Sequence, residues 1–127
     1  MIQREGPGWR LAWDPARCRY PVLIGGEGWA FELTGDEWRE LVSLITALME
    51  QHRALIDQLM AEEALSLELE RLPWWGCLDG DRDQWDLRVV LQGDDALEER
   101  GVEGHWPAPA AQAMAAAVRT LWDSPPS

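Results

Sequence analysis

One long amphipathic helix is the feature that most limits how this chain can fold. Residues 34–60 contain apolar side chains at the i, i+3, i+4, i+7 spacing of a single helical stripe. These are Trp38, Leu41, Val42, Ile45, Leu48, Met49, Leu55, Ile56 and Leu59. Thr34 and Glu37 have the spacing of a capping box, and Leu33 can pack on Trp38 across it. At 1.5 Å per residue such a helix is about 40 Å long, and other elements must cover its apolar stripe.

Alternating apolar and polar residues predict strands on both sides of this helix. The strands predicted before it span residues 8–14, 22–24 and 27–33. The strands predicted after it span residues 65–70, 74–78, 85–91 and 101–106, with an acidic loop at 93–100. Pro107 and Pro109 then open a second helix, because proline is favoured in a first turn. This helix is rich in alanine and is expected to lie against the long one.

The order of these elements predicts an α+β fold. We expect an antiparallel sheet with two helices in the order β(3)-α-β(4)-α, a tandem repeat of a strand-strand-strand-helix unit. With 127 residues the chain is expected to form a single domain. Its first half would span residues 8–60, its second half 61–123, and residues 124–127 would be a tail. The long helix exceeds what such a sheet needs to cover it, which predicts a homodimer.

The composition limits the classes of partner. The formal net charge is −12, and all eleven cationic side chains are arginine. Such a surface repels nucleic-acid phosphates and anionic lipids, so a basic protein partner is favoured and a membrane is not. No apolar run approaches ~18 residues and the first residues do not resemble a signal peptide, which predicts a cytoplasmic protein. Cys18 and Cys77 are expected to be reduced thiols.

The chain has nine tryptophans, which could form a stacking platform for bases or pack in the core. Five fall on the apolar faces of predicted elements and are expected in the core: Trp9, Trp13, Trp29, Trp38 and Trp85. The candidates for an exposed or partner-binding patch are Trp74, Trp75 and Trp106.

Arginines are concentrated near the N-terminus, where Arg10, Arg17 and Arg19 lie close in sequence to Tyr20. They could bind an anion or a nucleic-acid strand. The alternative is that they form ordinary surface pairs with the surplus of carboxylates, and this alternative is favoured because such pairs are common and weak.

No catalytic, cofactor-binding or metal-binding residues are predicted, and the chain is not expected to be an enzyme. Residues 79–83 resemble the start of a calcium loop but lack the glycine and glutamate that such a loop needs, so a hairpin tip is favoured. His52 lies on the helix stripe, where it could act as a pH switch or simply pack. The four possible zinc ligands Cys18, His52, Cys77 and His105 contain no pair at the usual short spacing.

Several short motifs carry a family resemblance. They are Gly8-Trp9-Arg10-Leu11, Trp13-Asp14, Gly25-Gly26-Glu27, Trp29-Ala30, Glu32-Leu33-Thr34 and Glu37-Trp38-Arg39. They resemble an uncharacterised cyanobacterial family, domain of unknown function 1818. That family is similar in fold to the single-stranded DNA-binding transcriptional regulators of the Whirly and PC4 type, in which strand-rich repeats each end in a helix. The resemblance implies this order of elements but no activity, and the chain lacks the lysine-rich strand motif of Whirly proteins.

These observations favour a non-enzymatic protein-interaction module that is acidic and soluble and forms a homodimer. The alternative is a single-stranded nucleic-acid-binding or transcription-associated protein of the Whirly/PC4 type, which the fold resemblance and the tryptophans suggest. A small-molecule site lined by tryptophan is a third possibility that no specific motif supports.

Overall fold

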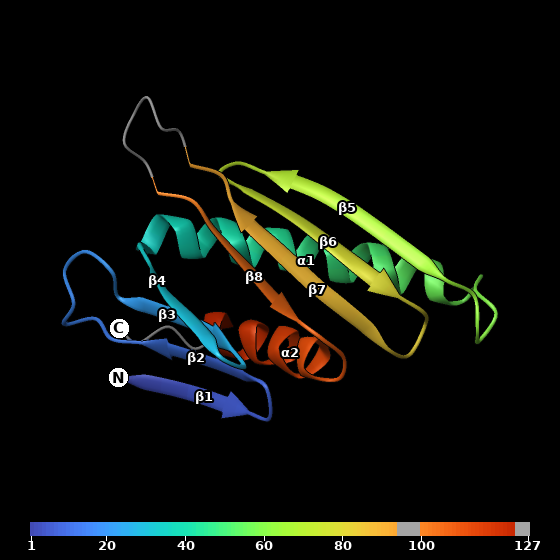
Figure 1. Cartoon of the computed structure of the whole chain (residues 1–127), viewed down its shortest axis with the longest axis horizontal. Coiled ribbons are helices and arrows are strands. Elements are labelled where there is room, and N and C mark those ends of the chain that lie inside the picture. Colours follow the sequence, from blue (N-terminus) through green and yellow to red (C-terminus); the bar gives the residue numbers. More distant parts are fainter. Residues whose placement is uncertain (94–99, 124–127) are drawn as a thin grey trace.

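The computed structural model describes residues 1–93 and 100–123. Four strands and a helix follow one another twice along the chain (Figure 1). The first set comprises β1 (Ile2–Gly6), β2 (Trp9–Trp13), β3 (Val22–Gly26), β4 (Trp29–Leu33) and α1 (Gly35–Ile56). The second set comprises β5 (Leu65–Arg71), β6 (Trp74–Gly80), β7 (Trp85–Leu91), β8 (Val102–Trp106) and α2 (Ala110–Asp123). Each set of strands forms its own antiparallel sheet, with the strands in chain order.

The predicted capping box starts α1. The Glu37 amide donates to Thr34 Oγ1 at 3.1 Å, and the Thr34 amide donates to Glu37 Oε1 at 2.8 Å. These two bonds satisfy backbone donors that an open helix end leaves without partners. The helix ends at Ile56, four residues before the predicted end. Leu59 continues the apolar spacing of the helix although it lies after the end of α1. No glycine or proline in the sequence marks the end of the helix at Ile56.

Two tight hairpins of the first sheet, β1–β2 and β3–β4, use the same local sequence, Gly-x-Gly-Trp. The second glycine of each motif, Gly8 or Gly28, has φ of 79° or 81°. A side chain is strained in that conformation, so glycine permits these tight turns. The ring of Trp9 covers Gly6 and the ring of Trp29 covers Gly26, where a Cβ would clash with the indole.

Both sheets and both helices share one hydrophobic core. Helix α1 packs on β5 and β6, and α2 packs on β1, β2, β7 and α1, which confirms the predicted helix–helix contact. The two sheets meet where Trp29 of β4 and Trp106 of β8 lie with ring centroids 5.0 Å apart. The core therefore connects the two β–α halves, although each sheet is separate.

The α+β class, the antiparallel pairing and the two helices are confirmed, but the predicted count of three strands before α1 is wrong. The additional strand is β1, which pairs with β2 from Ile2↔Trp13 to Gly6↔Trp9. It is an edge strand whose residues Gln3, Arg4 and Glu5 are exposed, so it shows no apolar alternation. Among the described residues, no helix is long and apolar enough to cross a membrane.

Candidate interaction surface

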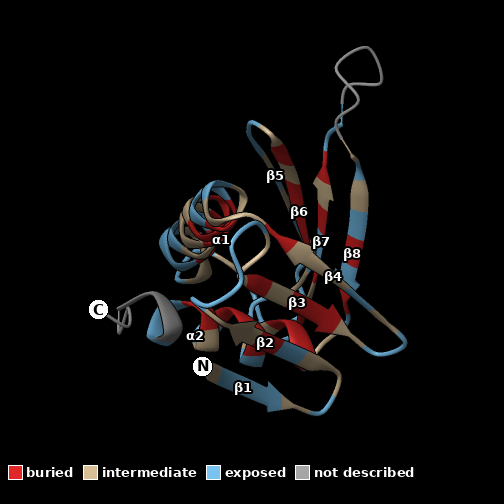
Figure 2. Cartoon of the chain, turned by 90° about the vertical axis from the view of Figure 1, so that its left-hand side faces the viewer, coloured by how far each residue is buried: buried red, intermediate tan, exposed pale blue. Residues whose placement is uncertain are grey.

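The face of the β5–β8 sheet opposite α1 is open and polar. In β7 the residues Trp85, Leu87 and Val89 are buried, whereas Asp86 and Arg88 between them point to the other face. Figure 2 shows α1 on one side of this sheet and no described element covering its other side. We call this uncovered side the outer face.

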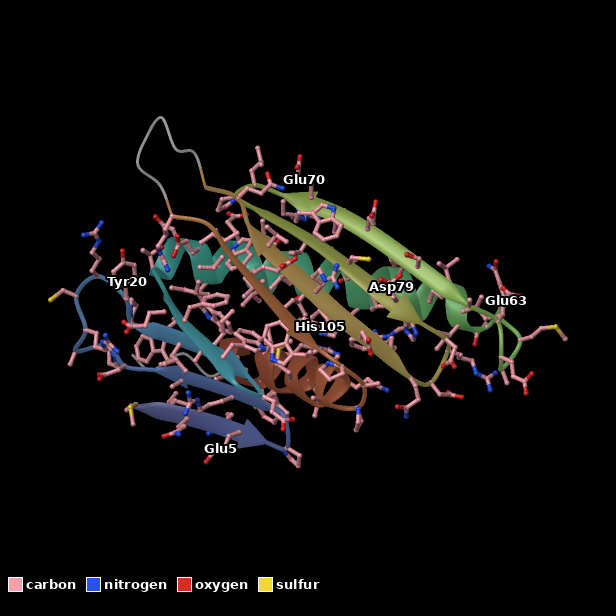
Figure 3. The ribbon with its side chains drawn as sticks, in the orientation of Figure 1. Glu5, Tyr20, Glu63, Glu70, Asp79 and His105 are labelled. Atoms are coloured by element: carbon pink, nitrogen blue, oxygen red, sulfur yellow. The ribbon has the colours of Figure 1, made fainter. Side chains whose placement is uncertain are left out.

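Strand register arranges the outer-face side chains in three rows across the sheet. The rows are Ser66, Asp79 and Asp86; then Glu68, Cys77, Arg88 and His105; then Glu70, Trp75, Val90 and Glu103. The carboxylates form what we call the acidic face: Glu68, Glu70, Asp79, Asp86 and Glu103. Figure 3 shows Glu70, Asp79 and His105 distributed across this sheet. Arg88 is the one arginine among these described outer-face residues, so the face is strongly negative.

Cys77 and Asp79 form a hydrogen-bonded pair on this face. Cys77 Sγ donates to Asp79 Oδ2 at 3.1 Å. Burial, together with the neighbouring Asp79 carboxylate, raises the pKa of the Cys77 thiol to about 11. Hydrogen bonds from Ser66 and Cys77 lower the pKa of Asp79. Cys77 therefore stays a neutral thiol at neutral pH, and thiolate chemistry is unfavourable there.

Asp86 Oδ1 accepts a hydrogen bond from the Ala108 amide at 2.9 Å, whereas the two ion pairs of the outer face are loose. His105 Nε2 lies 3.4 Å from Asp86 Oδ2, and Arg88 Nε lies 4.0 Å from Glu103 Oε1. All four side chains are 44–62% exposed, so each pair contributes less than about 1 kcal/mol to stability.

Cys77, Asp79, Asp86, Arg88 and His105 surround a small hollow of about 90 Å³. In the described ranges 1–93 and 100–123, no group of three or more His, Cys, Asp or Glu side chains is placed to hold a metal ion. Two of the four possible zinc ligands, Cys77 and His105, do share this hollow.

The other two possible zinc ligands lie elsewhere. Cys18 is exposed in the loop between β2 and β3. His52 is 7% exposed on α1, with its Nε2 3.4 Å from the Asp81 carbonyl oxygen and its ring centroid 5.9 Å from that of Trp85. Its position is thus a packed one, as the simpler interpretation of the helix stripe expected.

Two of the three tryptophans predicted for an exposed patch lie in the core instead. Trp74 and Trp106 are 0% exposed, and their Nε1 groups donate to the carbonyl oxygens of Glu37 and Gly25, both at 2.9 Å. The prediction was wrong because successive side chains of a strand point to opposite faces, and both tryptophans point to the core face. Trp74 lies on the same face of β6 as the buried Leu78, and Trp106 is buried in β8. Trp75 is half-buried on the outer face, so it alone of the three remains available to a partner.

The predicted arginine surface is divided between two places. Arg10 is exposed on β2 beside a hollow at the Gly-x-Gly-Trp hairpins. Arg17 and Arg19 lie beyond the other end of β2, where Arg17 pairs with Glu32 and Arg19 lies 5.3 Å from the centre of the Tyr20 ring. The simpler alternative, surface pairing with carboxylates, therefore holds for Arg17.

The loop that resembles a calcium site is a hairpin tip. Asp81 Oδ1 accepts from the amides of Asp83 at 2.9 Å and Gln84 at 2.8 Å, while the Asp81 amide donates to the Gln84 carbonyl oxygen. These amide bonds lower the pKa of Asp81, and they use the side-chain oxygen for the turn itself.

Arg100 is an important polar residue that the sequence analysis missed. Its guanidinium donates to the Glu32 carbonyl oxygen at 2.6 Å, pairs with Glu37 and lies 4.6 Å from the centre of the Tyr20 ring. The contact with Glu37 spans 63 residues, so no local pattern could have revealed it. Most of the acidic loop predicted before it, residues 94–99, lies outside the described residues.

Two comparisons place the chain among known proteins. The profile of the domain of unknown function DUF1818 matches residues 4–121. A crystal structure described as a protein with unknown function from DUF155 family from Prochlorococcus sp. NATL2A is similar to this chain, with 43% sequence identity and a TM-score of 0.90. The match covers 97% of this chain and 100% of that one. No curated protein matches the chain. The chain belongs to the DUF1818 family, a domain of unknown function.

Proposed function

We propose that this protein is a non-enzymatic protein-interaction module whose acidic face binds a basic segment of another protein. The observation that carries the proposal is the concentration of carboxylates on a sheet face that no described element covers. Charge complementarity of this kind accelerates association and selects partners of opposite sign. Trp75 and Val90 are half-buried in the same row and supply apolar contact area.

The free edge of β5 adds a second means of binding. β5 is the outermost strand of its sheet, and its seven residues include no proline or lysine. An exposed edge of this kind can pair with an extended segment from another chain. Glu68 and Glu70 would oppose each other if two copies paired through β5, whereas a basic strand would complement them.

The chemistry of the outer face supports a binding role. A protonated Cys77 thiol is a poor nucleophile, and the ion pair that His105 forms with Asp86 within the described part of the chain is loose. The carboxylate beside this thiol, Asp79, has a lowered pKa, which makes it a weak base for activating Cys77.

The acidic face is tested by reversing charge at Glu68 and Glu103. We expect E68K/E103K to weaken binding of the main protein captured from a lysate of the source organism by at least about tenfold, because attraction becomes repulsion. The matched control is E5K/E63K, which changes the net charge equally; Figure 3 shows Glu5 on β1 and Glu63 before β5. Affinities are measured with the purified partner. Equal binding by the two double variants, or a captured partner that is acidic, would contradict the proposal.

Single-stranded nucleic-acid binding is the alternative function, supported by the resemblance to Whirly and PC4-type regulators. The burial of Trp74 and Trp106 and the pairing of Arg17 leave few groups for it on the predicted surface. Salt-dependent titration with oligo-dT and oligo-U decides between the two functions, because binding to a phosphate backbone weakens steeply as salt rises. Absence of association at low salt would remove the alternative.

Homodimerisation stays a prediction. Of the residues whose burial is described, the large apolar ones that are most exposed are Met1, Met60 and Leu72, and they lie on separate segments. Sedimentation velocity at micromolar concentrations would show a dimer if the prediction is right and a strict monomer if it is wrong.

A further inference from the structure

Three arginines from three elements line one hollow on the helix side of the molecule. Arg39 comes from α1, Arg71 from the end of β5, and Arg119 from α2. The hollow has a volume of about 470 Å³, which is within the range of small-molecule sites. Ser43 and Thr46 also line it, and their hydroxyls add to the hydrogen-bond donors that the arginines supply.

The local charge is opposite to that of the whole chain. Although the chain has a formal net charge of −12, the hollow has three cationic side chains and one acidic side chain, Glu50. Arg39 also pairs with Asp36, one turn earlier in α1. Among the described residues, no ion pair forms with Arg71 or Arg119. Exposed cations near one another repel each other weakly, and a bound anion would relieve this repulsion.

We propose that this hollow binds a small molecule that carries a phosphate group. Guanidinium groups from three elements can approach a tetrahedral anion from different directions, which suits phosphate better than a single planar carboxylate. Ser43 and Thr46 would donate to the remaining phosphate oxygens. The hollow is larger than a phosphate ion, so the rest of the ligand would lie against the apolar surface of Val42 and Ala47.

The site is independent of the proposed protein-binding function. None of the acidic-face carboxylates lines the hollow, and none of its three arginines belongs to the acidic face. A small phosphate compound is also less affected than a nucleic acid by the negative field of the chain, because long-range repulsion grows with the charge of the ligand. Substitutions on one surface can therefore abolish binding there without affecting binding at the other surface.

The test is an NMR titration of the isotope-labelled protein with inorganic phosphate and with pyrophosphate, against sodium chloride at matched ionic strength. We expect phosphate and pyrophosphate to shift the amide signals of Ser43, Thr46 and Arg71, and chloride to leave them in place. R71Q and R119Q should each weaken pyrophosphate binding by at least about tenfold, the effect of losing one charge-assisted contact. The matched control is R82Q, since Arg82 lies at the β6–β7 hairpin tip, does not line the hollow and forms an ion pair with Asp83.

Several results would overturn the proposal. If phosphate and pyrophosphate caused no amide shifts beyond those of chloride, the hollow would not be a phosphate site. If R71Q, R119Q and R82Q bound pyrophosphate equally well, the anion would bind elsewhere. Citrate binding as tightly as pyrophosphate would assign the hollow to carboxylates. Tighter binding of oligo-dT that is lost in R71Q and R119Q would make the hollow a nucleic-acid contact. Retained folding of both variants, checked by circular dichroism, ensures that a lost signal reports on binding.

Discussion

Replacing Trp106 with alanine is expected to lower the free energy of unfolding by about 3–5 kcal/mol. Trp106 is 0% exposed, and its indole packs against Trp29 at a centroid distance of 5.0 Å. Its Nε1 group donates to the Gly25 carbonyl oxygen at 2.9 Å, which joins β8 of one sheet to β3 of the other. The substitution therefore leaves a large cavity and also removes a hydrogen bond between the two sheets. Denaturant unfolding followed by circular dichroism measures the loss.

Two further variants separate the causes of this loss. W106F keeps most of the ring but leaves the Gly25 carbonyl without its donor, so we expect a loss of about 1–3 kcal/mol. This variant also remains measurable if W106A fails to fold. W75A removes a half-buried indole from the outer face and should cost less than W106A. A loss below about 1 kcal/mol for W106A would contradict the burial of this residue.

Replacing Gly80 with alanine is expected to destabilise the β6–β7 hairpin by about 1–3 kcal/mol. A Cβ at this position would lie 2.2 Å from the Gln84 carbonyl oxygen and 2.5 Å from Trp85 Cα. Both are backbone atoms, Trp85 in the paired strand β7 and Gln84 in the turn just before it, so the hairpin must shift to accept a methyl group. The same unfolding measurement reports the effect, and the shift would also disturb the alignment of Asp79 and Asp86 across the sheet.

The matched control is the same substitution, glycine to alanine, at Gly35. Apart from its chain neighbours and the backbone of its own helix, no atom lies within 4 Å of a Cβ built at Gly35, the first residue of α1. G35A should therefore leave stability unchanged or raise it by up to about 1 kcal/mol, since alanine is the better helix former. Wild-type stability for G80A, or equal losses for the two variants, would contradict the expected clash.

Elements with a strong local pattern were predictable. The alternation of Trp85, Leu87, Val89 and Leu91 gave the bounds of β7, and the capping box located the start of α1. These patterns were sufficient because side-chain periodicity and capping depend on residues only a few positions apart. β1 escaped prediction because its only large apolar residue is Ile2, and its pairing with β2 stabilises it instead.

The candidate sites depended on contacts that no local pattern contains. Each strand of the β5–β8 sheet was predicted, but the acidic face required the order and register of the strands to align Glu68, Cys77, Arg88 and His105. Likewise, Arg39, Arg71 and Arg119 are distant in sequence and line one hollow only because α1, β5 and α2 pack together.

The sequence by itself determined the α+β class, most of the strands, both helices and the overall negative charge. Tertiary structure alone decided which tryptophans are buried, which carboxylates share a face and which arginines converge. The physical reason is the range of the interactions: backbone periodicity is set by neighbouring residues, whereas burial and electrostatic grouping depend on which distant surfaces pack to form the core.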